Sequence, residues 1–151
     1  MYLDPMTESG VKRSVILLVD DNLDDLFLTR RAFERAGVKH EVQSVSSGAE
    51  AIAYLAGNSP YDDRISHPLP DLILLDIKMP ATGGFDVLRW VRRQPQFVRL
   101  CVVMLTSSDD LRDVNQAYML GANCFLVKPL DFWNAADLSR SIERLLEMNG
   151  R

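Results

Sequence analysis

Four apolar runs in this chain each end at a polar side chain that can do chemistry. The runs and their end residues are VILLV before Asp20 and Asp21, LILL before Asp76, VVML before Thr106, and FLV before Lys128. An unbroken run of Val, Ile and Leu is typical of a strand that is buried on both faces of a parallel sheet. In such sheets ligands bind beyond the carboxyl ends of the strands. The pattern therefore predicts an α/β fold that gathers three carboxylates, a hydroxyl and an ammonium group at one edge of the sheet.

Strand-like and helix-like segments alternate five times along the chain. Predicted strands cover 14–19, 41–45, 71–76, 100–105 and 123–127, and predicted helices cover 23–36, 48–56, 84–93, 110–120 and 132–147. Asn22 is the expected N-cap of the first helix, and Gly37, Gly57 and Gly121 are expected to end three helices in the left-handed conformation. Residues 58–70 contain three prolines and no periodicity, which predicts a long surface loop.

Length and charge narrow the class of protein. The 151 residues fit one domain, which we expect to span 14–151 after a flexible leader at 1–13. A net charge of -4 argues against a general attraction to nucleic acid or to an anionic membrane. No apolar stretch approaches the roughly 20 residues of a membrane span, and the N-terminus lacks the apolar region of a secretion signal. We therefore expect a cytoplasmic protein.

The cysteines and histidines show no metal-binding pattern. Cys101 and Cys124 begin apolar runs without ligand spacing around them, so they are expected to be buried, reduced thiols. His40 and His67 stand alone near loops and strand starts, and they are expected at the surface rather than as ligands.

The three aspartates need a positive partner if they converge. Two carboxylates at about 4 Å repel by roughly 4 kcal/mol at an effective dielectric constant near 20. Mg²⁺ suits this count of carboxylates better than a Ca²⁺ cage, because it keeps several waters and accepts phosphate oxygens. The alternative role for Asp20 and Asp21 is helix capping, which Asn22 already serves.

The remaining strand-end residues suit phosphoryl chemistry. An aspartate placed like Asp76 can attack phosphorus and form an aspartyl phosphate. Lys128 could pair with a phosphoryl oxygen, although it could also be an ordinary surface lysine. Thr106 could donate a hydrogen bond to the same group, although with Ser107 and Ser108 it could also form a simple turn.

Taken together, the segments LLVDDN, LILLDIKMPATGG, VVMLTSS and GANCFLVKP resemble the receiver domain of two-component response regulators, from Ser14 to about Met148. The resemblance implies a flavodoxin-like, doubly wound, five-stranded parallel sheet of order 2-1-3-4-5 with five helices. It also implies a role for each of the following residues: Asp76 as phosphoacceptor, Asp21 as a direct Mg²⁺ ligand, Asp20 as a ligand through water, the main-chain carbonyl of Lys78 as a third protein ligand, Thr106 and Lys128 as catalytic and phosphate-pairing groups, and Phe125 as the aromatic switch partner of Thr106.

A finer similarity concerns partners. DNLDDLFLTRRAF, the long loop and YMLGANCFLVKPLDFW are similar to the stand-alone regulators that pair with bacterial phytochrome kinases. This implies a sensor histidine kinase as phosphoryl donor, with a phytochrome as the specific hypothesis, and a homodimer through the fourth helix, fifth strand and fifth helix, where Phe132 and Trp133 could lie in the interface. Lys78 departs from the uncharged residue frequent two positions after the phosphoacceptor.

Other functions remain open at this point. The chain could be a receiver-like module that binds partners without phosphorylation. A flavin carrier on the same sheet order is disfavoured, because Asp20 and Asp21 would repel the flavin phosphate. An aspartyl phosphatase would need an acid where Lys78 stands. We expect no nucleic-acid-binding or enzymatic output domain, so apart from its own phosphorylation and dephosphorylation the chain would act through contact with a downstream protein that the sequence does not identify.

Overall fold

The computed structural model describes residues 13–107, 111–128, 130 and 134–148. Residues 1–12 of the expected leader and the expected interface residues Phe132 and Trp133 lie outside these residues. The elements are β1 (Val15–Val19), α1 (Leu23–Arg35), β2 (Glu41–Val45), α2 (Gly48–Ala56), β3 (Leu72–Asp76), α3 (Gly84–Arg93), a short 3-10 helix η1 (Pro95–Phe97), β4 (Cys101–Thr106), α4 (Leu111–Met119), β5 (Cys124–Val127) and α5 (Ala135–Met148). The strands pair in parallel in the order β2-β1-β3-β4-β5, which confirms the predicted flavodoxin-like sheet.

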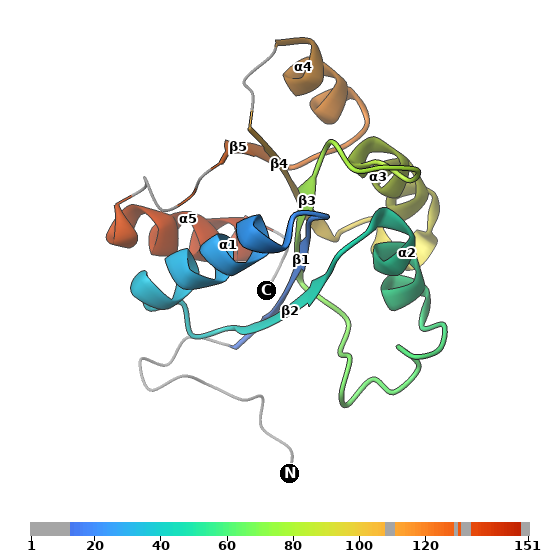
Figure 1. The fold of residues 1–151 in the computed structure, drawn as a ribbon, viewed down its shortest axis with the longest axis horizontal. Helices are drawn as coiled ribbons and strands as arrows, with labels where there is room; N and C mark the ends of the chain where they lie inside the picture. Colours follow the sequence, from blue (N-terminus) through green and yellow to red (C-terminus); the bar gives the residue numbers. More distant parts are fainter. Residues whose placement is uncertain (1–12, 108–110, 129, 131–133, 149–151) are drawn as a thin grey trace.

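Helices cover both faces of the sheet, as the unbroken apolar runs predict. All five residues of β3 are buried, and their side chains alternate between the two layers. Leu72 and Leu74 pack into the layer that contains residues of α1 and α5, whereas Ile73 and Leu75 pack into the layer that contains residues of α2 and α3. Figure 1 shows α1 and α5 together on one side of the sheet and α2 and α3 on the other. The central strands are therefore held firmly, and their carboxyl ends have fixed positions.

The last helix, α5, packs an apolar stripe against the sheet. Leu138, Ile142 and Leu145 of α5 are buried in the layer shared with α1. The helix begins at Ala135, and the side-chain oxygen of the preceding residue, Asn134, accepts a hydrogen bond from the Ala136 amide. Within the part of the chain that the structure describes, no helix combines the length and the apolar character needed to cross a membrane, and α5 itself has 14 residues.

The predicted loop at 58–70 is anchored to α2 at several points. The Arg64 guanidinium donates hydrogen bonds to the carbonyls of Tyr54, Leu55 and His67 at 2.8, 3.0 and 3.2 Å. The Tyr54 hydroxyl, in turn, donates to the Pro68 carbonyl at 2.8 Å. The loop therefore satisfies the last carbonyls of α2 while its exposed tip, including Ile65, faces solvent.

His40 is buried, so the expectation of a surface position is wrong. Its Nδ1 accepts a hydrogen bond from the Ser14 amide at 2.8 Å, and its Nε2 contacts the Glu143 carboxylate of α5. Because Nδ1 accepts, the ring proton sits on Nε2 and points at Glu143. His40 thus links the starts of β1 and β2 to α5, and it has a structural role rather than a metal-binding one.

Candidate functional site

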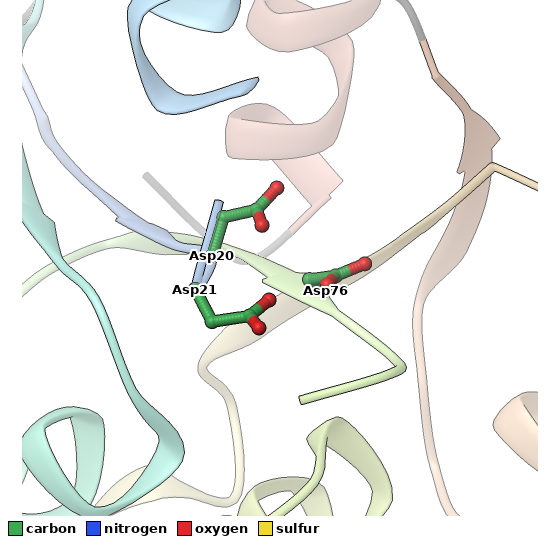
Figure 2. Close-up of side chains that lie close together, drawn as sticks. All are labelled: Asp20, Asp21 and Asp76. Carbon is green, nitrogen blue, oxygen red and sulfur yellow. The ribbon is translucent and has the colours of Figure 1, made fainter. Parts of the chain in front are cut away.

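The three predicted carboxylates meet at the carboxyl ends of β1 and β3. One oxygen from each of Asp20, Asp21 and Asp76 lies within 4.8 Å of the other two. Figure 2 shows the three side chains pointing to the same side of the strand ends. Asp20 and Asp76 are buried, with 3% and 6% of their surface exposed, whereas Asp21 is exposed. The convergence follows from the topology, because β1 and β3 are paired neighbours in the sheet.

Lys128 reaches into the same cluster from the end of β5. Its ammonium Nζ lies 2.9 Å from Asp20 and 3.4 Å from Asp76. A third carboxylate, that of Asp25 on α1, is 2.8 Å from the same nitrogen. The Lys128 side chain is only 11% exposed, so these contacts form in an environment with limited screening.

Burial and repulsion make ionised Asp76 costly. Desolvation and then the neighbouring charge of Asp20 raise the pKa of Asp76 from 3.8 to about 6, although Lys128 opposes this shift. For Lys128, burial alone would lower the pKa, but hydrogen bonds to Asp25 and Asp20 and the charge of Asp76 outweigh burial and raise that pKa above its usual value. The carboxylates thus hold Lys128 in its charged form, whereas burial and the charge of Asp20 disfavour the ionised form of Asp76 despite the nearby ammonium.

A cavity of about 210 Å³ opens over these groups. It is lined by Asp20, Asp21, Asp76, Lys78, Thr106 and Lys128, all predicted from the sequence, together with Asn22, Asp25 and Ser107. Four carboxylates therefore face two ammonium groups, and the excess negative charge suits a divalent cation. Hard carboxylate oxygens are the ligand type that Mg²⁺ prefers, so this set of residues fits the metal that was predicted.

The backbone after β3 packs closely against the acceptor strand. A Cβ atom on Gly84 would lie 2.2 Å from the main-chain oxygen of Asp76, so only glycine permits this approach of α3. Gly83, by contrast, has a φ of −81°, and its added Cβ would meet nothing closer than 3.4 Å. The left-handed residue of the turn is Ala81, with a φ of 63°. Of this glycine pair, only Gly84 is therefore required sterically.

The two predicted switch residues lie on neighbouring strands. Thr106 ends β4 and is 2% exposed, and its main-chain carbonyl accepts a hydrogen bond from the Lys128 amide at 2.7 Å. Phe125 on β5 is partly buried and packs against the core layer that contains residues of α2 and α3. Thr106 therefore belongs to the cavity wall, whereas Phe125 lies in the adjacent packing layer.

Asp25 is the site residue that the sequence analysis missed. It lies in the first turn of α1, where acidic residues are common because they complement the helix dipole. Nothing local distinguishes it from its neighbour Asp24 as a partner of Lys128. The sequence therefore carries no signal that selects Asp25 from the acidic first turn of α1.

Comparison with known proteins places the chain in a family. Residues 16–140 match the response regulator receiver domain. The chain is 35% identical over 133 residues to the probable methanogenesis regulatory protein FilR2 of Methanothrix harundinacea, covering 88% of this chain and 81% of that protein. It is 32% identical over 138 residues to the response regulator Rcp1 of Synechocystis sp., covering 91% and 92%. The structure of the bacteriophytochrome response regulator AtBRR matches with a TM-score of 0.75 and 35% identity over 92% of this chain and 94% of that one.

Proposed function

Because the chain belongs to the response regulator receiver domain family, we propose that Asp76 accepts a phosphoryl group from the phosphohistidine of a sensor histidine kinase. The observation that carries this proposal is the convergence of Asp20, Asp21 and Asp76 within 4.8 Å, with the Lys128 ammonium 3.4 Å from the acceptor carboxylate. Phosphorylation on an aspartate in the presence of Mg²⁺ is typical of the family.

In the proposed reaction an ionised oxygen of Asp76 attacks phosphorus. The new O–P bond forms as the P–N bond of the phosphohistidine breaks, and the leaving imidazole nitrogen keeps the electron pair and takes up a proton. Lys128 lies close enough to pair with a phosphoryl oxygen, and the Thr106 hydroxyl can donate to another. These two residues would stabilise charge that the transfer places above the strand ends.

The acidic residues have a second proposed role, which is to hold Mg²⁺. Asp21 and Asp76 would bind the ion directly, Asp20 through water, and the main-chain carbonyl of Lys78 would complete the protein ligands. When bound, Mg²⁺ neutralises charge on the phosphoryl oxygens during transfer. The support for this assignment is the excess of carboxylates over ammonium groups around the cavity.

We propose that the signal leaves the site through Thr106 and Phe125. A hydrogen bond from the Thr106 hydroxyl to the phosphoryl group would draw the end of β4 toward Asp76, and Phe125 on the paired strand β5 would change its rotamer. The face formed by α4, β5 and α5 would then bind a downstream protein or a second copy of the chain. Phe132 and Trp133 remain the predicted contact residues of such a homodimer.

A phytochrome kinase is the proposed phosphoryl donor. The support is the similarity to the structure of the bacteriophytochrome response regulator AtBRR. The test is transfer of labelled phosphoryl from an autophosphorylated phytochrome kinase, compared with a histidine kinase of another sensor class. Faster transfer from the second kinase would contradict this assignment without affecting Asp76.

The test of the acceptor is intact-protein mass after incubation with acetyl phosphate and Mg²⁺. The unmodified chain should gain one phosphoryl group, and Asp76→Asn should gain none. Asp62→Asn, on the exposed loop, is the matched control and should be phosphorylated like the unmodified chain. A phosphoryl group on Asp76→Asn would show that Asp76 is not the acceptor. If the folded unmodified chain gains no phosphoryl group from either acetyl phosphate or a kinase, an interaction module that works without phosphorylation would be favoured.

A further inference from the structure

The feature that the proposed mechanism leaves unused is the contact between Asp25 and Lys128. The Asp25 carboxylate is the nearest partner of the Lys128 ammonium, at 2.8 Å, compared with 2.9 Å for Asp20 and 3.4 Å for Asp76. Asp25 is not one of the three clustered carboxylates, and it comes from α1 rather than from a strand end. It therefore binds the lysine without belonging to the predicted metal ligands.

We propose that Asp25 is a positioning residue that competes with the phosphoryl group for Lys128. In the unphosphorylated protein Asp25 holds the ammonium toward α1, and a phosphoryl group on Asp76 must draw it away. This inference rests on the proposed function, because it assumes that Lys128 pairs with the phosphoryl group. It adds a residue that sets how strongly phosphorylation changes the site.

Differences in exposure indicate which contact gives way. The Asp25 side chain is 34% exposed, whereas those of Asp20 and Asp76 are 4% and 9% exposed. Water can therefore replace Lys128 at Asp25, but a buried carboxylate that lost the ammonium would keep an uncompensated charge. When the ammonium moves, the contact with Asp25 is the one that lengthens.

The backbone prevents Asp25 from following the lysine. The Asn22 side chain accepts hydrogen bonds from the amides of Asp24 and Asp25 at 3.0 and 3.1 Å, which fixes the first turn of α1. The contact between Asp25 and Lys128 joins residues 103 positions apart, so it opposes movement of the β5 end relative to α1. Removing the Asp25 charge should therefore favour the arrangement that carries a phosphoryl group.

The first test measures binding of beryllofluoride, a phosphoryl mimic, in the presence of Mg²⁺. Asp25→Asn should bind the mimic about three- to tenfold more tightly than the unmodified chain, the range expected for loss of a partly exposed charged hydrogen bond. Asp24→Asn is the matched control: it lies on the same turn, is exposed and removes the same charge, so its affinity should stay within about twofold. Equal affinities for the two variants, or weaker binding by Asp25→Asn, would overturn the proposal.

The second test asks whether Lys128 transmits the effect. In a Lys128→Met background, Asp25→Asn should no longer increase the affinity for beryllofluoride, because there is no ammonium to release. A gain that persists undiminished would mean that Asp25 repels the anion directly, and the proposed competition would be wrong. The NMR signal of the Lys128 ammonium provides a readout without metal or phosphoryl group: Asp25→Asn should shift this signal, Asp24→Asn should not, and an unshifted signal in Asp25→Asn would count against the contact.

These experiments distinguish a failure of the proposed role of Asp25 from a failure of the proposed function. If the unmodified chain neither binds beryllofluoride nor gains a phosphoryl group, the proposed function fails. If it does both, and Asp25→Asn behaves like Asp24→Asn, only the role of Asp25 fails.

Discussion

Replacing the proposed acceptor should stabilise the metal-free protein. Asp76 is buried beside Asp20, and desolvation and then this neighbour raise the pKa of Asp76 from 3.8 to about 6. A folded state that raises the pKa of an acid disfavours its ionised form relative to the unfolded chain. Asp76→Asn removes this charge at nearly constant size, so we expect a more stable protein that cannot be phosphorylated at this position.

The size and the pH range follow from the shift. The rise in the pKa of Asp76 from 3.8 to about 6 lowers the free energy of unfolding by roughly 3 kcal/mol at a pH above about 6, where Asp76 is ionised in both the folded and the unfolded chain. Between about pH 4 and pH 6 the unfolded chain loses the proton while the folded chain keeps it, so the stability contributed by this group falls as the pH rises. Below about pH 4 the acid is protonated in both states, and the difference from asparagine should disappear.

The assay is urea unfolding followed by circular dichroism in the presence of a metal chelator. At pH 7, the free energy of unfolding of Asp76→Asn should exceed that of the unmodified chain by up to about 3 kcal/mol. Near pH 4 the two free energies should become equal. Adding Mg²⁺ should stabilise the unmodified chain more than the variant, because the ion offsets the repulsion. Asp62→Asn should change little at either pH. A variant that is no more stable at pH 7, or whose advantage is unchanged near pH 4, would refute the reasoning.

Two further substitutions test the supports of the site. Gly84→Ala places a Cβ against the main-chain oxygen of Asp76 and should lower the free energy of unfolding by about 1–3 kcal/mol, whereas Gly83→Ala should lower it by less. Equal losses of stability for the two variants in thermal or urea unfolding would contradict the steric argument. Arg64→Met keeps much of the side-chain length but removes the donors to the carbonyls of α2. This variant should lose about 1–3 kcal/mol of its free energy of unfolding, and amide hydrogen exchange at the end of α2 should become faster. Unchanged exchange there would show that the loop does not hold the helix.

The sequence was sufficient for the sheet because its signals are local. The run before Asp76 has no polar interruption, which is typical of a strand covered on both faces, and the structure buries every residue of β3. The predicted helices at 48–56 and 84–93 have the bounds observed for α2 and α3. The meeting of Asp20, Asp21 and Asp76 was predictable for the same reason, because parallel strands end at one edge of a sheet.

The sequence could not give the pairings between distant side chains. His40 can be buried because the Glu143 carboxylate, 103 positions away, accepts a hydrogen bond from its ring, and no local pattern indicates such a partner. Asp25 resembles any acidic residue at the start of a helix until the fold brings Lys128 to it across the same separation of 103 positions. These contacts depend on how α1 and α5 pack on the sheet, which is a property of the whole domain rather than of a segment.

The architecture explains why charge at Asp76 can control the domain. Asp20 and Asp76 are attached to paired, buried strands, so their main chains cannot separate to relieve the repulsion without disturbing the ladder between β1 and β3. The repulsion can instead be reduced by a proton, a cation or a movement of Lys128. Lys128 directly follows the edge strand β5, which pairs with β4 alone among the described strands, so the lysine is attached at the edge of the sheet rather than at its centre. If a phosphoryl group draws Lys128 from Asp25, as we propose, we expect it to act first on the end of β5 rather than on the central strands.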